Sequence, residues 1–207
     1  MFSWMPFEAP RAGSVNEPVN AREFRAALGA FPTGVCLITT ADENGKHEGL
    51  TANSFSSVSM DPPLVLWSLA NHAASAGIFI KAKHFAIHVL GAADGALAMH
   101  FARPAKDKFE AYAGRFEAGL GGCPVLAGAV AVFECSSYSQ YEGGDHTIFV
   151  GRVEKFTREH LDPLAFHAGK LTSMLNAASV SPRHDGFSRN RTRQPGPQQG
   201  GIHQPFK

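Results

Sequence analysis

The residues best suited to bind a ligand gather in one stretch of the chain, between Glu48 and Trp67. Seven small hydroxyl or amide side chains lie within it or just beyond it, among apolar residues: Thr51, Asn53, Ser54, Ser56, Ser57, Ser59 and Ser68. Each such group buried without a partner would cost about 1–3 kcal/mol, and a core strand does not need so many of them. The simplest explanation is a pocket wall that hydrogen-bonds a flat polar ligand carrying a phosphate, which points to a flavin and to redox chemistry. The alternative is an edge strand whose polar face lies in water.

Two turns near this stretch could complete such a pocket. In Phe31-Pro-Thr-Gly34, Pro32 fixes the backbone and Gly34 would let a ligand approach closely, although an ordinary helix-to-strand turn has the same composition. Asn71-His-Ala-Ala-Ser75 follows Ser68 and leads into a predicted helix, where free backbone N–H groups, hydroxyls and His72 could hold a phosphate. The competing interpretation of Ser75 is a simple helix N-cap.

A third turn, Gly143-Gly-Asp-His146, lies between two apolar strands. A histidine can donate, accept or stack, so His146 could position a second ligand over the first. A histidine after a turn is also often structural, and Asp145 could serve only to stabilise the turn. His84 and His88 are four residues apart, but their segment alternates like a strand, so we expect no metal site there or elsewhere.

The composition excludes several classes of protein. Of the 207 residues, 44% are hydrophobic and 18% are charged, which is typical of a globular chain. The formal net charge of +1 gives no reason to expect a nucleic-acid partner. No apolar run approaches the ~20 residues that span a bilayer, so we expect no membrane association. We identify no secretory signal, and the three cysteines (Cys36, Cys123 and Cys135) match neither a CxxC nor a zinc pattern. These features favour a cytoplasmic protein with reduced thiols.

The chain divides into a folded middle and two loose ends. We expect an irregular N-terminal arm over 1–19, a folded domain over 20–180 and a disordered basic tail over 181–207. Phe2, Trp4 and Phe7 could dock the arm on the domain or on a second subunit. We favour a solvated tail over one that contacts nucleic acid.

Within the domain, the hydrophobic pattern predicts mostly strands. Helices are expected over Asn20–Leu28, Ala73–Ile80, Asp94–Phe101 and Leu164–Leu175. Strands are expected over Thr33–Thr40, Lys46–Ser54, Leu64–Leu69, Phe85–Leu90, Ala129–Ser137, Ser139–Tyr141 and Asp145–Glu154, with a hairpin turn at Asp42-Glu-Asn-Gly45. Many short strands with few helices favour a β-barrel or sandwich. The spacing of Gly119-Leu-Gly-Gly122 does not fit a dinucleotide-binding fingerprint, which disfavours a Rossmann domain.

Three blocks together resemble a known family. They are Phe31-Pro-Thr-Gly-Val, Gly49-Leu-Thr-Ala-Asn-Ser-Phe-Ser-Ser-Val-Ser-Met-Asp-Pro-Pro-Leu-Val and Gly144-Asp-His-Thr-Ile-Phe-Val-Gly-Arg-Val, in this order. The stretch from about Phe24 to Leu175 resembles the short flavin reductases, the reductase components of two-component flavin-dependent monooxygenases. The resemblance implies a mainly β fold, a Greek-key split β-barrel of the FMN-binding type with a few short peripheral helices. It also implies a homodimer that binds FMN or FAD and takes a hydride from NADH or NADPH.

The same resemblance assigns roles to individual residues. Pro32 and Thr33 match residues beside the isoalloxazine ring, and Thr51, Ala52, Asn53 and Ser54 match those that bond its polar edge. The region around the flavin phosphate is matched by Ser56, Ser57, Ser68, Asn71, His72 and Ser75. The nicotinamide side is matched by Gly144, Asp145 and His146, with Arg115 and Phe116 nearby. His146 is thereby a candidate catalytic residue that positions the nicotinamide, whereas Cys36 and Trp67 match core positions.

The resemblance thus predicts an NAD(P)H-dependent flavin reductase that supplies reduced flavin to a partner monooxygenase. One alternative is a flavin-binding protein without reductase activity, such as a flavin store or a redox sensor. A flavin-dependent oxidase of the pyridoxamine-phosphate-oxidase type would share the barrel. The Gly-Asp-His block favours the reductase over both. A purely structural β-barrel module would not explain the hydroxyl-rich stretch.

Overall fold

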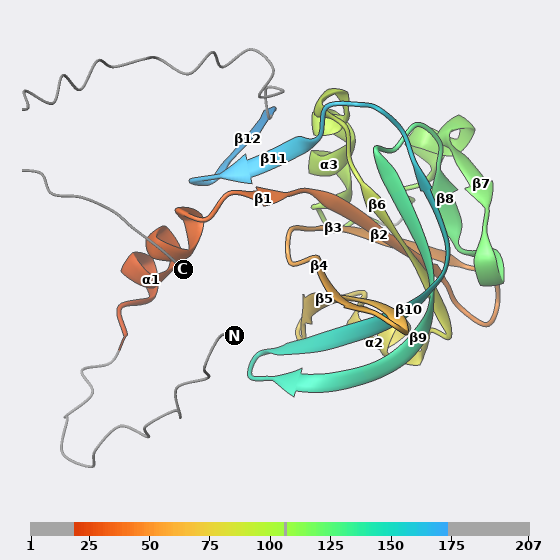
Figure 1. Cartoon of the computed structure of the whole chain (residues 1–207), viewed down its shortest axis with the longest axis horizontal. Helices are drawn as coiled ribbons and strands as arrows, with labels where there is room; N and C mark the ends of the chain where they lie inside the picture. Colours follow the sequence, from red (N-terminus) through yellow and green to blue (C-terminus); the bar gives the residue numbers. More distant parts are fainter. Residues whose placement is uncertain (1–18, 106, 174–207) are drawn as a thin grey trace, which may run out of the picture. The chain divides into compact units, whose positions relative to one another are not determined.

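The computed structural model describes residues 19–105 and 107–173. Within these residues, twelve strands form sheets of seven, three and two strands, so the expectation of a mainly β chain is confirmed (Figure 1). The predicted tail over 181–207 and all but the last residue of the predicted arm lie outside the described residues.

An antiparallel sheet with the strand order β3-β2-β6-β9-β10-β5-β4 is the centre of the fold. In chain order, its strands are β2 (Cys36–Ala41), β3 (His47–Ala52), β4 (Ser56–Met60), β5 (Pro63–Ala70), β6 (His84–Val89), β9 (Ala131–Gly143) and β10 (His146–Arg158). A three-stranded sheet joins β1 (Thr33–Gly34), β11 (Leu164–His167) and β12 (Lys170–Ser173), and β7 (Phe116–Ala118) pairs with β8 (Pro124–Leu126). Strand β3 is therefore an edge of the large sheet.

The helices are short and lie between the strands. They are α1 (Ala21–Gly29), α2 (Ala76–Lys81) and α3 (Gly95–Phe101), with 3-10 turns over Ala92–Asp94, Glu110–Arg115 and Leu120–Gly122. Asn20 caps α1 as predicted, because its side chain accepts from the backbone N–H groups of Arg22 and Glu23. The helix predicted over Ala73–Ile80 begins at Ala76, since residues 71–75 form a turn.

Strand β2 separates two hydrophobic cores. Cys36 and Ile38 point into a core built around Trp67, whose ring stacks on Phe149 with centroids 4.6 Å apart. Leu37 points to the opposite face, into a core that includes Leu97 of α3. This two-residue alternation is what an extended strand imposes, and burial on both faces explains why β2 is apolar throughout its first half.

The first hairpin forms as its sequence predicts. Asp42 Oδ1 accepts hydrogen bonds from the backbone N–H groups of Asn44 and Lys46, at 2.8 and 2.9 Å. Gly45 has a φ of 76°, a conformation that costs glycine little. The turn therefore sets the β2–β3 register that brings Thr51 and Ala52 opposite Leu37 and Cys36.

The helix predicted over Leu164–Leu175 is wrong. The described part of this segment is the β11–β12 hairpin, whose flanking residues His167 and Lys170 pair across the turn. Ala168 and Gly169 both have positive φ values, 48° and 79°, as a two-residue type I′ turn requires. Alanine is uncommon at such a position, so the turn lacks the Asn-Gly signature that would have revealed it.

Two other strand boundaries differ from the prediction. The strand expected over Thr33–Thr40 is divided into β1 and β2, because Thr33 and Gly34 pair with β11 whereas β2 pairs with β3 and β6. The strands expected over Ala129–Ser137 and Ser139–Tyr141 are one strand, β9, with an irregularity opposite Val150 and Gly151. Strand β4 lies at the other edge of the large sheet and is mostly exposed, as the edge-strand alternative for this stretch predicts.

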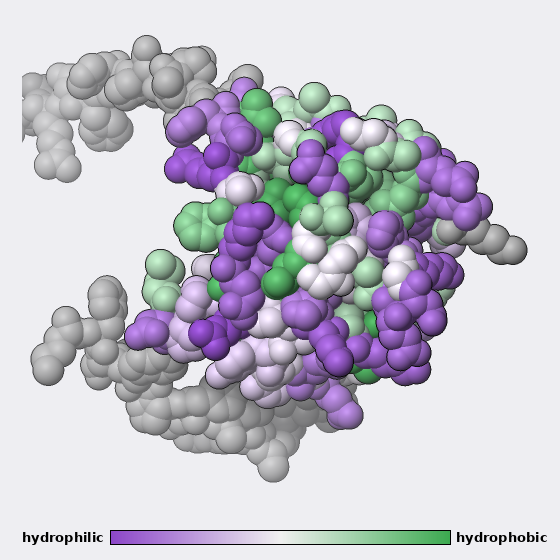
Figure 2. Space-filling model, turned by 90° about the vertical axis from the view of Figure 1, so that its right-hand side faces the viewer, coloured by the Kyte–Doolittle hydropathy of each residue, from purple (hydrophilic) through white to green (hydrophobic). Residues whose placement is uncertain are grey.

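The surface is polar over much of the face in Figure 2, where apolar residues lie in small patches between hydrophilic ones. None of the helices in the described residues has the length and apolar character needed to cross a membrane.

Candidate active site

Two neighbouring cavities lie beside the hydroxyl-rich stretch. Cavity A, of about 250 Å³, is lined by Val35, by Thr51–Asn53, by Ala98, Met99 and Ala102, and by Phe166, Gly169 and Leu171. Cavity B, of about 560 Å³, is lined among others by Leu50, Thr51, Leu69, Ala73–Ser75, Phe101–Ala105 and Lys108. Thr51 and Ala102 belong to both walls, so the two cavities are contiguous around the end of β3.

Cavity A combines apolar walls with an exposed backbone edge. Strand β3 pairs with β2 on one side only, and its outer edge presents backbone N–H and C=O groups without a sheet partner. The residues at its end, Thr51 to Asn53, line the cavity, while Met99 and Phe166 supply apolar walls. Such an arrangement suits a flat ring that carries polar atoms along one edge.

Cavity B carries positive charge and a buried hydroxyl. Ser75 is 8% exposed and lies at the N-cap position of α2, yet its side chain makes no capping hydrogen bond. The simple N-cap interpretation of Ser75 therefore lacks its hydrogen bond. Arg103 also lines the cavity, and its guanidinium makes no hydrogen bond or ion pair with the described residues.

Lys108 is a second cation in the wall of cavity B, but its ammonium is already occupied. It donates to Gly49 O at 2.9 Å, lies 3.5 Å from Phe101 O and lies 3.7 Å from a carboxylate oxygen of Glu48. Only 11% of its side chain is exposed. Lys108 therefore ties β3 to the segment after α3, and Arg103 remains the cation available to an anionic ligand.

Several hydroxyls of the predicted pocket wall bond within the protein. Thr51 Oγ1 donates to Ala98 O at 2.6 Å, which attaches α3 to β3. Ser54 Oγ lies 3.0 Å from both Ser68 N and Ser68 O, so it accepts from the first and donates to the second. The hydroxyls of Thr51 and Ser54 are therefore engaged within the protein, and of the two residues only Thr51 lines the cavities. Ser56 and Ser57 are exposed on β4 and line neither cavity.

The turn before β1 lies next to cavity A. Thr33 pairs with the wall residue Phe166, and the wall residue Val35 lies two positions later in the chain. Thr33 Oγ1 is buried and has no hydrogen-bond partner among the described residues. Pro32, one residue earlier, is exposed. An unpaired buried hydroxyl is costly, so Thr33 is a candidate ligand contact.

The turn between β9 and β10 presents His146 together with Asp145. Gly144 adopts a φ of 70°, which allows the tight reversal, and His146 opens β10 opposite Ala70, the last residue of β5. His146 Nδ1–H donates to Asp145 Oδ1 at 2.7 Å, which leaves Nε2 at the free end of the ring. This hydrogen bond and the charge of His146, with a smaller contribution from His72, lower the pKa of the Asp145 carboxyl.

The predicted nicotinamide residues do not all lie together. The Arg115 guanidinium lies 3.3 Å from Asp94 Oδ1 and donates to Ala127 O at 3.0 Å. Phe116 packs edge-on against Phe101 and Phe109 in the second core. In the part of the chain that the structure describes, neither Arg115 nor Phe116 makes a hydrogen bond, ion pair or ring contact with the Gly144–His146 turn.

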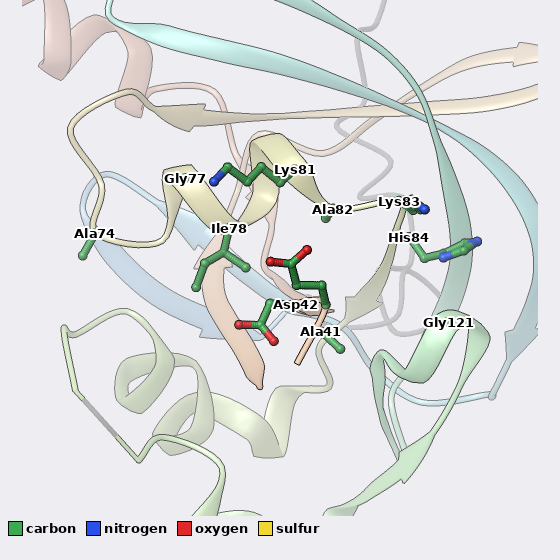
Figure 3. A pocket seen from close by; sticks show the side chains of 11 residues that line it. Ala41, Asp42, Ala74, Gly77, Ile78, Lys81, Ala82, Lys83, His84 and Gly121 are labelled. Atoms are coloured by element: carbon green, nitrogen blue, oxygen red, sulfur yellow. The ribbon is translucent and has the colours of Figure 1, made fainter. Parts of the chain in front are cut away.

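A third cavity, of about 630 Å³, is larger than either of these but contains none of the predicted site residues. Its wall includes Asp42 and Glu43 of the first hairpin, Lys81 of α2, His84 and Gly121. Figure 3 shows Lys81 and Asp42 on opposite sides of the cavity. Its charges are mixed, and the carboxylate of Asp42 already accepts hydrogen bonds from two backbone N–H groups of the hairpin. We therefore place the candidate site in cavities A and B.

Buried titratable groups outside these cavities are chemically quiet. Burial lowers the pKa of His88 to about 4, and its Nδ1–H donates to Leu37 O at 2.9 Å, so the ring is neutral and structural. Burial also raises the pKa of both Cys36 and Cys135 to about 12. These thiols are not thiolates at neutral pH, which removes them as nucleophiles.

Comparison with known proteins decides the family. The flavin reductase like domain matches residues 28–174. The chain belongs to the flavin reductase family. It is 43% identical over 160 residues to the stachydrine N-demethylase reductase subunit Stc3 of Rhizobium meliloti, covering 77% of this chain and 69% of that protein.

Two further flavin reductases extend the comparison. The FMN reductase (NADH) SmoA of Agrobacterium fabrum is 44% identical over 152 residues, covering 72% of this chain and 84% of SmoA. The structure of the NADH:FAD oxidoreductase SgcE6 of Streptomyces globisporus, in complex with NAD and FAD fragments, superposes with a TM-score of 0.71 at 35% identity, covering 84% of this chain and all of that one. Other matches are longer, and this chain spans 55% of one curated relative and 53% of one solved chain.

Sequence reasoning missed much of the wall of cavities A and B. Met99, Ala102 and Arg103 line it from α3 and the segment that follows, and Phe166 and Leu171 line it from the misassigned hairpin. The available signal was the cationic sequence Arg103-Pro-Ala-Lys-Asp-Lys108 directly after an apolar helix. That pattern is common on surfaces, and only the fold brings it opposite Ser75.

Proposed function

We propose that cavities A and B together hold FMN or FAD, and that this protein is an NAD(P)H-dependent flavin reductase with its reaction centre at this position. The activity follows from membership of the family over residues 28–174. The position is supported by one observation above all: a backbone edge and a cationic, hydroxyl-bearing cavity are contiguous at Thr51. A bound flavin supplies the redox chemistry by accepting a hydride from the reduced nicotinamide ring.

The chain contributes binding and orientation. Backbone groups of Thr51 and Ala52 at the end of β3, and of Asn53 and Ser54 directly after it, would bond the polar edge of the ring system. Oriented N–H groups stabilise negative charge that develops there. Thr33 Oγ1 is the buried donor beside them, with Pro32 adjacent. Ser75 and Arg103 would hold the phosphate in cavity B. For Ser56, Ser57, Ser68 and His72, only the resemblance supports contact with the flavin.

His146 is the proposed positioning group for the nicotinamide. Asp145 accepts a hydrogen bond from Nδ1–H of His146. When the ring is neutral, Nε2 is therefore an acceptor, which can receive a hydrogen bond from the carboxamide N–H of the nicotinamide. Hydride transfer requires donor and acceptor atoms roughly 3–3.5 Å apart. An imidazole in a fixed position would help to hold the nicotinamide ring at that distance from the flavin. The contacts of Arg115 and Phe116 favour packing beside cavity B over direct contact with the nicotinamide.

The proposed partners are a second copy of the chain and a monooxygenase that consumes reduced flavin. Relatives named as reductase subunits or reductase components support the monooxygenase. Helix α1 buries none of its residues, and Phe24, Leu28 and Phe31 are 53%, 59% and 74% exposed, which supports a dimer contact there. The unpaired thiols Cys36, Cys123 and Cys135 support a reducing, cytoplasmic location.

The split β-barrel is also part of the proposal. Strand β3 lies at one edge of the seven-stranded sheet, and β5 lies near the other. The Ser54–Ser68 hydrogen bonds join the end of β3 to β5 across that distance in the strand order, which supports a curled sheet.

The deciding experiment mixes the purified protein with FMN or FAD and NADH or NADPH and follows the absorbance of the reduced nicotinamide. Fast turnover is the expected result, with NADH the better donor because three relatives are named for NADH. Flavin binding without turnover would support a flavin store or sensor instead. If neither binding nor turnover occurs, the proposal is overturned.

A further inference from the structure

Asn71 is hydrogen-bonded to the His146 turn through three of its polar groups. Its backbone N–H donates to Asp145 O at 2.9 Å, its Nδ2 donates to Gly144 O at 3.3 Å, and its Oδ1 accepts from Thr147 Oγ1 at 2.7 Å. The contacts flank His146 on both sides along the chain. Asn71 itself follows β5 directly, so it lies where the main sheet ends and the turn towards Ser75 begins.

These contacts argue against the role that the sequence suggested for this residue. A side-chain amide that bonded the flavin phosphate would direct Nδ2 to the ligand, but here both ends of the amide bond the opposite turn. Asn71 is also absent from the walls of cavities A and B. The segment that it begins does reach the flavin side, because Ala73 and Ser75 line cavity B.

The turn has few other anchors. His146 is 45% exposed and Asp145 is 84% exposed, and Gly144 has no atom within 4 Å of the position a Cβ would take. Within the described residues, the His146 ring makes one hydrogen bond, to Asp145 of the same turn. The ring is therefore oriented relative to its own turn. The turn is held by the β9–β10 pairing, in which His146 pairs with Gly143, by the β5–β10 pairing, and by the side chain of Asn71.

We infer that Asn71 is a positioning residue that fixes the Gly144-Asp145-His146 turn relative to cavity B, and so sets the distance between nicotinamide and flavin. This inference rests on the proposed role of His146. It gives Asn71 a function in the nicotinamide half of the reaction rather than in flavin binding.

The test is a double-mutant cycle between Asn71→Ala and His146→Ala, with kcat and KM for NADH measured at saturating flavin. Asn71→Ala alone is expected to lower kcat/KM for NADH about tenfold, the scale of losing two partly exposed hydrogen bonds. The dissociation constant for FMN is expected to change less than about twofold. In the His146→Ala background the further effect of Asn71→Ala should fall to less than about twofold, because the residue through which it acts is gone.

Two variants keep the test independent of general stability. Thr147→Val removes one of the two side-chain contacts and should give an intermediate loss in kcat/KM. Gln140→Ala is the matched control: it removes an exposed amide-to-backbone bond, Nε2 to Ile80 O at 3.0 Å, from the β9 strand away from the turn. Its kinetics should match the wild type even if its melting temperature falls.

Each outcome has one meaning. Equal losses for Asn71→Ala in both backgrounds, or a weakened FMN affinity, would overturn the inference while leaving the proposed function intact. An unaltered His146→Ala enzyme would overturn both the role of His146 and the inference. Suppression of the Asn71 effect in the double mutant supports it.

Discussion

At the scale of single residues, Arg103 is the charged side chain in the wall of cavities A and B that has no partner among the described residues. It lines cavity B beside Ser75. We predict that Arg103→Gln weakens FMN binding about tenfold, which corresponds to about 1.4 kcal/mol, because a charge-assisted contact to the phosphate is lost. Fluorescence titration of FMN measures this, and riboflavin, which lacks the phosphate, should bind both proteins equally.

The matched control for Arg103 is Arg152→Gln. Arg152 lies on β10 with its guanidinium 4.0 Å from Glu154, and it lines neither cavity. FMN should bind this variant as it binds the wild type. An Arg103 effect that is equally large for riboflavin would mean that Arg103 supports the cavity wall and not the phosphate.

His88 predicts how stability depends on pH. Burial lowers its pKa to about 4, from 6.5 in the unfolded chain, so between these values the unfolded state binds more protons and stability rises with pH. The stabilising contribution is complete above the unfolded pKa and is lost as the pH falls towards the folded pKa. Between about pH 7.5 and about pH 5 the loss from this residue is about 2 kcal/mol.

Urea unfolding of wild type and His88→Gln at these two pH values isolates that contribution. Glutamine does not titrate, and its amide can still donate towards Leu37 O. The pH-dependent part of the unfolding free energy should therefore be about 2 kcal/mol smaller in the variant. The prediction fails if the two proteins show the same pH dependence.

The hydroxyl-rich stretch shows what sequence can and cannot give at this scale. The end of β3 lines both cavities, as the pocket-wall interpretation expects, whereas Ser56 and Ser57 are exposed on the edge strand β4. Thr51 nevertheless bonds Ala98, which lies 47 residues away in the chain. Such hydrogen-bond partners depend on how α3 packs on β3, and no local sequence pattern predicts that packing.

At the scale of secondary structure, the sequence predicted a turn or a helix cap correctly where a single local motif specifies it. The Asn-Gly turn and the Asn20 cap satisfy backbone groups within a few residues, so their sequences sufficed. The prediction for the segment from Leu164 failed because its apolar residues fit one face of a helix. Ala168 also occupies a turn position where glycine or asparagine is usual, so the sequence does not indicate the turn. Its strand character comes from pairing with β1, which lies about 130 residues earlier in the chain.

That hairpin gives a further prediction, since Phe166 forms part of the wall of cavity A. Phe166→Ala removes apolar contact area from the wall, so we expect FMN affinity to fall about tenfold while the sheet remains folded. Flavin fluorescence quenching measures the affinity, and circular dichroism confirms the fold. Phe156→Ala is the control, because Phe156 is 69% exposed on β10 and lines neither cavity.

At the scale of the whole molecule, α1 is an amphipathic helix whose apolar residues are not buried by any of the described residues. Phe24 and Leu28 are four residues apart and so share a face, yet both are more than half exposed. Contiguous exposed apolar residues on a short helix are expected to pack against something, and a second copy presents the same face by symmetry. The aromatic residues of the N-terminal arm are the competing occupant.

We therefore predict that Leu28→Asp converts a dimer into a monomer. Light scattering after size exclusion should give twice 22.1 kDa for the wild type and 22.1 kDa for the variant. Ala26→Asp places the same charge on the opposite side of α1, so it should leave the dimer intact. A monomeric wild type would instead indicate that the N-terminal arm covers the apolar face. Removal of residues 1–18 would then lower solubility without changing the measured molecular mass from that of a monomer. If Leu28→Asp remains a dimer, the subunits meet elsewhere, and the exposed residues of β4, where Met60 is 91% exposed, become the next face to test.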